Sequence, residues 1–151
     1  MRAFPHHIVI AVICFAVLYP GTAWAHDDQS TAPTESDAIE TVMNDAADAL
    51  AHGDARMVSR YFPLKVYLNL FTGENAYYSR EQGAMILRNY FASYQPVSFT
   101  YTGINRKGRN PYGVGTLSFI HQGRRGTAQV YLSLTGTQDG WKIGHITISR
   151  R

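Results

Sequence analysis

Cysteine, acidic residues and long apolar runs are all scarce in this chain of 151 residues. The single cysteine, Cys14, has no partner within the chain, so core packing alone must hold the fold. Only two acidic residues, Glu81 and Asp139, follow position 75, whereas ten lysines and arginines do. Such a basic half can mark a nucleic-acid-binding protein, but these bases are not interleaved with aromatic residues as single-strand binding requires. We therefore expect no nucleic-acid partner.

The apolar run near the N-terminus, from Ile8 to Leu18, is too short to span a bilayer comfortably. A basic start precedes it, and a helix breaker at Pro20-Gly21 and a small-x-small cleavage site at Ala23-Trp24-Ala25 follow. We interpret residues 1–25 as a secretory signal peptide, which leaves no transmembrane anchor after cleavage. The sequence thus predicts export to the periplasm or the extracellular space.

The remainder of the chain has the length of one domain. We expect residues 26–35 to be a disordered lead, because they are polar and lack an apolar period. Residues 36–151 then form a single α+β domain. It starts with an amphipathic helix from Ile39 to Leu50, for which Thr34 or Ser36 can serve as N-cap, and a short helix over "ARMVSRYF" follows.

The rest of the domain alternates strands and turns around one more helix. "KVYLNLF" alternates as a strand does, and Ser79 followed by Gln82 is a capping box that starts a helix from Arg80 to Tyr94. From Val97 onward, four strands joined by three turns form an antiparallel meander. The predicted fold class is therefore α+β, with N-terminal helices packed on a curved antiparallel sheet.

The register of the last hairpin decides which side chains face the helices, because a one-residue slip turns every side chain over. Pairing Leu134 with Trp141 places Val130 opposite His145 on the inner face. The expected inner face is otherwise aliphatic and aromatic: Val97, Phe99, Tyr101, Leu117, Phe119, Val130, Leu132, Leu134, Trp141 and Ile143. The expected outer face mixes hydroxyl and apolar side chains, among them Thr116, Ser118, Gln129, Tyr131, Ile146 and Ile148. Because a half-apolar exposed face is typical of a partner surface, we predict a homodimer through it.

The first strand of the meander joins the sheet best if Phe99 faces Leu117 and Tyr101 faces Gly115. This pairing requires a bulge or an odd-sized loop near residues 105–111. Tyr101 then covers the gap that a strand glycine leaves.

This order of elements, with "AHGDARMVSRYF" as a helix, a glycine and a short helix, resembles the nuclear transport factor 2-like (cystatin-like) superfamily. The stretches "YYSREQGAMILRNYF", "YGVGTLSF", "AQVYLSL" and "WKIGHITI" are similar to a group of small exported bacterial proteins known as domain of unknown function 4783. The resemblance covers residues 36 to 150. It implies a cone of curved sheet around helices, export, and a pocket at the open end of the cone. It implies no activity, since this fold hosts enzymes, carriers and interaction modules alike.

An enzyme of the ketosteroid isomerase type needs a carboxylate base and an acid donor in an apolar cavity. The expected inner face holds no Asp or Glu. His145 is the one ionisable group we place there, and a lone histidine on an apolar face is more often a core residue. As an alternative function we keep a small isomerase, lyase or hydrolase that uses His145 with Tyr101.

The sequence contains no phosphate loop, nucleophile elbow or cysteine pair, and its histidines are scattered, so we predict no metal site and no cofactor. Tyrosines are plentiful and suit the lining of a cavity for an apolar small molecule. We predict a ligand pocket lined by Tyr67, Tyr90, Phe91, Tyr101, Trp141 and His145. The favoured function is thus a non-enzymatic binding or assembly module.

The basic turns gather at two ends of the meander. The turn "QGRR" and the C-terminus bring together Arg124, Arg125, Arg150 and Arg151, while Arg106, Lys107 and Arg109 lie at the opposite end. We interpret the clusters as a solvated rim or as contacts to anionic material outside the cytoplasm, which salt would weaken.

Overall fold

The computed structural model describes residues 34–150, so the predicted signal peptide and most of the predicted lead lie outside the described residues. Three helices and six strands follow one another in this part of the chain: α1 (Glu35–His52), α2 (Ala55–Ser59), β1 (Lys65–Leu70), β2 (Asn75–Ser79), α3 (Arg80–Ser93), β3 (Gln95–Asn105), β4 (Tyr112–His121), β5 (Arg124–Thr137) and β6 (Gly140–Arg150).

Capping side chains set the ends of the two long helices. Thr34 and Asp37 form a capping box that starts α1, so of the expected lead Glu35 belongs to this helix and Thr34 caps it. Gly53 ends α1 in the left-handed conformation, with φ of 68°. Ser79 and Gln82 form the predicted capping box of α3.

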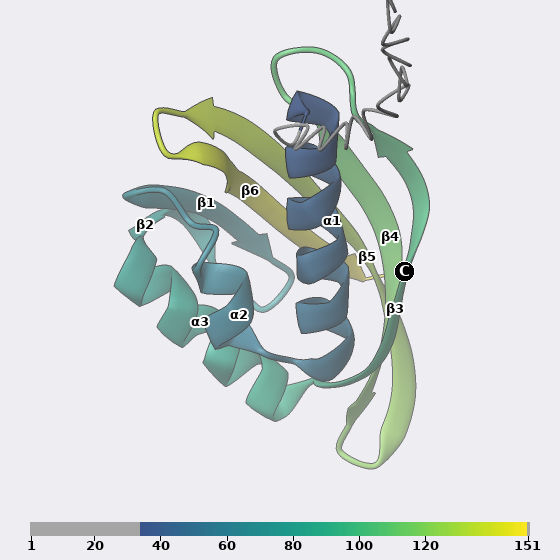
Figure 1. Cartoon of the computed structure of the whole chain (residues 1–151). Coiled ribbons are helices and arrows are strands. Elements are labelled where there is room, and N and C mark those ends of the chain that lie inside the picture. Colours follow the sequence, from purple (N-terminus) through teal and green to yellow (C-terminus); the bar gives the residue numbers. More distant parts are fainter. Residues whose placement is uncertain (1–33, 151) are drawn as a thin grey trace, which may run out of the picture. The chain divides into compact units, whose positions relative to one another are not determined.

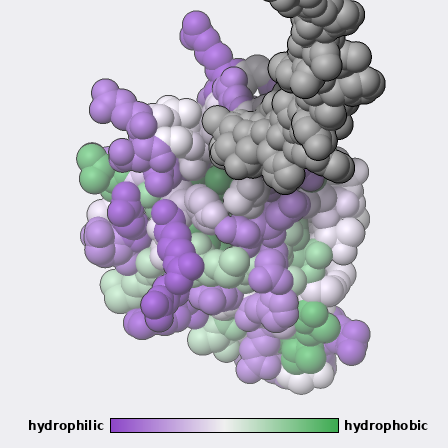
Figure 2. All heavy atoms as spheres, in the orientation of Figure 1, coloured by the Kyte–Doolittle hydropathy of each residue, from purple (hydrophilic) through white to green (hydrophobic). Residues whose placement is uncertain are grey.

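The six strands form one curved, unclosed sheet in the order β2-β1-β6-β5-β4-β3. β1 pairs with β6 in parallel, while the neighbouring strands elsewhere in the sheet pair antiparallel. The helices lie on one face of this sheet, with α1 in front of its central strands (Figure 1). Seen from the helix side, the surface is mostly hydrophilic, with hydrophobic residues between (Figure 2).

The core fills the space between the helices and the inner face of the sheet. Helix and loop side chains such as Met43, Leu50 and Phe62 are 0–1% exposed. The predicted inner positions Leu117, Phe119, Val130, Leu132, Leu134 and Ile143 are buried against them, as expected. Val97 is not, because it lies in a bulge between Pro96 and Ser98 and is 44% exposed.

The predicted register of the last hairpin is wrong. Leu134 pairs with Ile143, whereas Ser133 pairs with His145, so Gly144 is an extra residue in β6. Such a bulge reverses the alternation of side chains beyond it. His145 therefore points to the outer face and not to the inner one. For the same reason Ile146 and Ile148, expected on the outer face, are buried in the core at 0% and 1% exposure.

Two strand glycines leave room for aromatic rings, but the prediction that Tyr101 covers Gly115 is wrong, because the Phe99 ring lies there. Phe99 pairs with Leu117 and Tyr101 with Gly115, as predicted, although the bulge lies between Tyr101 and Gly103 and not near residues 105–111. The Phe99 ring covers Gly115, and the Tyr101 ring covers Gly113.

We predict that Gly115→Ala destabilises the protein by about 1–3 kcal/mol, since the new methyl group overpacks a filled site. It would overlap the Phe99 ring and lie 2.7 Å from the carbonyl oxygen of Thr100. Gly103→Ala in β3 is the matched control, because no atom lies within 4 Å of its added methyl group. Denaturant unfolding of both variants measures the difference, and equal stabilities would contradict the packing at Gly115.

Tyr90 on α3 has a buried hydroxyl group with no hydrogen-bond partner among residues 34–150. The side chain is 4% exposed and packs edge-on against Phe71 and Phe91. Burial raises the pKa of Tyr90 well above its usual range, and the neighbouring Tyr94 adds to this effect. The hydroxyl group thus stays protonated and unpaired in an apolar cluster.

Removing this hydroxyl group should therefore stabilise the fold. We expect Tyr90→Phe to raise the free energy of unfolding by about 1 kcal/mol, because an unpaired buried hydroxyl is unfavourable. Tyr101→Phe should lower it by about 1 kcal/mol, since the Tyr101 hydroxyl donates to the Met43 carbonyl oxygen at 2.9 Å. Thermal and denaturant melts compare the two variants. A marked loss of stability in Tyr90→Phe would show that its hydroxyl has a partner after all.

Candidate functional site

The six residues predicted to line a pocket do not share one. Tyr90 and Phe91 are buried in the core, at 4% and 5% exposure. Trp141 pairs with Gly136 near the β5–β6 turn. Tyr67 and His145 lie on the outer face of the sheet, opposite to the other members of the set. The described hollows of the surface are lined by none of these six side chains.

The alternative catalytic pair is separated as well. The Tyr101 hydroxyl reaches the backbone of α1 on the inner face, whereas the His145 ring lies among side chains of the outer face. His145 Nε2 lies 2.8 Å from Thr147 Oγ1, the one hydrogen-bond partner of this ring within the described chain. Because a sheet lies between them, His145 and Tyr101 do not form a common acid–base site.

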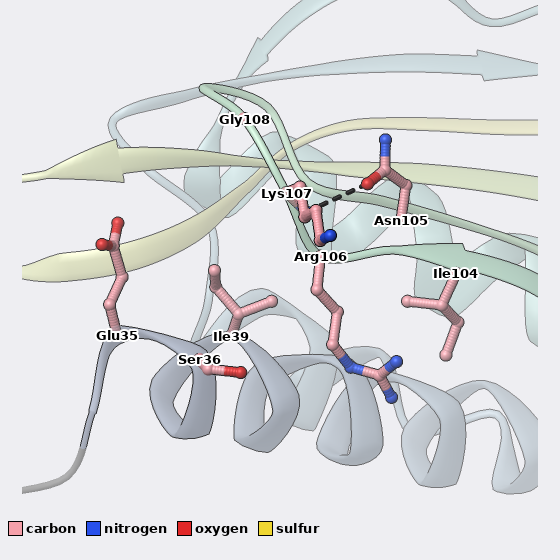
Figure 3. Close-up of a pocket in the computed structure, with 8 residues that line it drawn as sticks. All are labelled: Glu35, Ser36, Ile39, Ile104, Asn105, Arg106, Lys107 and Gly108. Atoms are coloured by element: carbon pink, nitrogen blue, oxygen red, sulfur yellow. Dashed lines mark hydrogen bonds between the residues drawn. The ribbon is translucent and has the colours of Figure 1, made fainter.

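A hollow lies beside the helices where α1 begins. About 680 Å³ in volume, it lies between the start of α1 and the β3–β4 loop. Figure 3 shows the Arg106 side chain reaching toward α1, with Ile39 and Ile104 on either side, while the Glu35 carboxylate points away. No histidine lines this hollow, and its apolar wall is limited to the two isoleucines. None of the residues predicted to line a pocket lines this hollow.

The outer face carries a row of aromatic rings that crosses five neighbouring strands. The row consists of Tyr77, Tyr67, His145, Tyr131 and Tyr112, on β2, β1, β6, β5 and β4 in that order. Successive ring centroids are 5.0, 4.8, 5.4 and 5.6 Å apart. These distances are typical of aromatic pairs in contact. We call this set the outer aromatic row.

Strand pairing explains how the row forms. Tyr67 lies directly beside both Tyr77 and His145, through the antiparallel β1–β2 and the parallel β1–β6 pairs. Tyr131 pairs with Thr147, two residues beyond His145, so the row continues diagonally. His145 joins it only because of the bulge at Gly144. The sequence signal for this was the spacing of the apolar residues in β6, which changes from two to three between Ile143 and Ile146.

Electrostatics keep the centre of the row neutral. Burial lowers the pKa of His145 below its usual value, so the ring is uncharged at neutral pH. The Tyr67 hydroxyl donates to Asn75 Oδ1 on the neighbouring strand. Charged side chains on this face lie toward its margins, at Lys65, Lys142 and Arg125. The arrangement offers polarisable surface and hydrogen bonds, but no paired acid and base.

Metal-binding geometry is not evident in the part of the chain that the structure describes, since no three His, Cys, Asp or Glu side chains there converge on one point. None of the helices within residues 34–150 combines the length and apolar character needed to cross a bilayer.

Solved structures of several proteins share this fold. A DUF4783 family protein from Bacteroides uniformis superposes with a TM-score of 0.65 at 16% identity, covering 72% of this chain and 95% of its own. A ketosteroid isomerase-like protein from Erwinia carotovora gives 0.63 at 13% identity, over 77% and 95%. A protein of unknown function with a cystatin-like fold from Nostoc punctiforme gives 0.61 at 15% identity, over 80% of each chain. At such identities these likenesses show the fold alone.

Sequence comparison is more specific. No curated protein matches the chain significantly. The sequence pattern of one family, described as "Domain of unknown function (DUF4783)", matches residues 43–149, which is more than half of the chain. Together with the nuclear transport factor 2-like, cystatin-like architecture, this match shows that the chain belongs to the DUF4783 family.

Proposed function

We propose that this protein is an exported, non-enzymatic binding or assembly module that works through the outer face of its sheet. The observation that carries the proposal is the outer aromatic row, which lies on the face that no helix of residues 34–150 covers. The inner face, in contrast, is occupied by the core, with Leu117, Val130 and Ile143 at 0% exposure. The enzymatic alternative has less support, because no carboxylate orients His145 among the described residues.

The composition of the outer face supports a protein partner. Interface centres are rich in tyrosine and poor in charge, and their rims are polar. Here the tyrosines and Thr147 occupy the middle, and Lys65, Lys142 and Arg125 lie around them. Tyr77, at 70% exposure, is the most accessible ring of the row.

The partner that we propose is a second copy of this chain. Stacked sheets usually align within about 30° of each other, and a two-fold axis would place the row of one copy across the row of the other. Thr116, Ser118, Gln129 and Tyr131 would lie in this contact, as the sequence predicted for the dimer. Ile146 and Ile148 would not, since they belong to the core.

Sedimentation of the purified protein over a range of concentrations tests this proposal. We expect a monomer–dimer equilibrium that Tyr131→Glu weakens by at least about 2 kcal/mol, or thirtyfold, because a charge would be buried at the centre of the contact. Gln138→Glu in the exposed β5–β6 turn adds the same charge outside the row and should change nothing. A wild-type monomer at all concentrations would rule out the second copy as the partner.

The dimer should also weaken in mild acid. Burial lowers the pKa of His145, which means that the folded chain favours the neutral ring. The contribution of this group to the stability of the fold is therefore fully present above pH 6.5, and it is lost as the pH falls through the lowered pKa. Burial of the ring in a dimer would strengthen this trend. We therefore expect tighter association at about pH 7.5 than at about pH 5.5, and a flatter dependence in His145→Gln. An unchanged pH dependence in the variant would show that other groups cause it.

A further inference from the structure

A basic hollow lies at the end of the sheet where the β4–β5 turn meets the C-terminal end of β6. It has a volume of about 520 Å³. Its lining residues include three arginines and no acid: Phe119, His121, Gln122, Arg124, Arg125, Gly126, Thr127 and Arg150. We propose that this arginine hollow binds a phosphate group of a ligand, independently of the outer aromatic row.

The turn and the strand order place the three arginines around this hollow. Gln122 and Gly123 both have positive φ, 50° and 74°, as a two-residue hairpin turn requires. The turn is therefore tight, and Arg124 pairs directly with His121 at the end of the hairpin. On the other side of β5, Arg150 of β6 pairs with Ala128. Arginines distant in sequence thus converge on one hollow.

The positive charge of this hollow is not neutralised by the described part of the protein. Within residues 34–150, none of the three arginines has a carboxylate oxygen within 4.0 Å. Most of the acids are elsewhere, chiefly on α1. A concave site lined by one sign of charge attracts ions of the other sign. Guanidinium groups are well suited to this role because their planar fork matches the oxygens of a phosphate group in bidentate contacts.

Two of the groups that line the hollow contact aromatic rings of the protein. The Arg150 guanidinium carbon lies 5.2 Å from the centroid of the Phe71 ring, a cation–π distance. The His121 ring stacks on Tyr94 at 4.2 Å and 14°, and its Nδ1 lies 2.8 Å from the Ser93 carbonyl oxygen. Side chains fixed in this way lose less conformational entropy when a ligand binds. The hollow is thus partly preorganised.

Phosphate groups of two sources would fit this chemistry, a small soluble ligand and the headgroup of an anionic lipid. Arg124, Arg125 and Arg150 are all exposed, so a ligand much larger than the hollow can still present its phosphate. The experiment therefore needs one arm for each source. Inorganic phosphate serves as the soluble probe, and vesicles of phosphatidylglycerol, compared with phosphatidylcholine alone, serve as the lipid probe.

We expect saturable binding of at least one probe, weakened by added salt and reduced tenfold or more in Arg124→Gln/Arg150→Gln. Titration followed by the arginine side-chain NMR signals measures the soluble arm, and co-sedimentation with vesicles measures the lipid arm. Arg88→Gln on α3 removes one exposed charge far along the chain from the hollow and should leave binding unchanged.

The outcomes separate the sources. Arginine-dependent binding of inorganic phosphate supports a soluble ligand, and arginine-dependent binding to phosphatidylglycerol vesicles alone supports a lipid headgroup. Failure of both probes, or equal binding by the double variant and wild type, overturns the proposal. Tyr131→Glu should bind the probes as the wild type does, so a failed dimer proposal and a failed phosphate proposal are distinguishable.

Discussion

The bulge at Gly144 is the constraint on which the rest of this structure depends. A regular strand alternates its side chains, so Ile143 and Ile146 can share the inner face only if β6 holds one extra residue between them. With that residue in place, Ile143, Ile146 and Ile148 all enter the core. The same shift turns His145 outward, beside Tyr67 of the parallel strand β1. The extra residue in β6 thus decides which of its side chains lie on each face of the sheet.

The two faces consequently differ in what they can do. The inner face of the sheet is buried against the helices. A hollow remains at the start of α1, but none of the expected pocket residues lines it. The outer face holds aromatic rings from five strands, and the arginine hollow lies at one end of the sheet. Other proteins of this fold resemble enzymes such as ketosteroid isomerase, but the fold itself does not decide function. In this member of the DUF4783 family, the binding role that we propose rests on surface chemistry.

Much of the fold could be predicted because its signals are local. The capping box at Ser79, an N-cap at Thr34 and the pairing of Phe99 with Leu117 could all be predicted from the sequence. The candidate site was not, because it depends on pairing between β1 and β6, which are far apart in the chain, and on the face that His145 takes. The spacing of three between Ile143 and Ile146 was the available signal. The register predicted from the turn did not use this signal. It therefore placed His145 on the inner face and Ile146 on the outer face, the reverse of the structure.

Thiol accessibility tests most directly whether the faces are assigned correctly. In a chain carrying Cys14→Ser, the variants His145→Cys and Ile146→Cys place one thiol each at neighbouring positions of β6. At concentrations where the chain is monomeric, our account predicts labelling at position 145 in the folded protein by a soluble thiol reagent, and labelling at position 146 only after unfolding, since Ile146 is 0% exposed. Rapid labelling at 146 together with protection at 145 would contradict the bulge, the outer aromatic row and the function proposed from them.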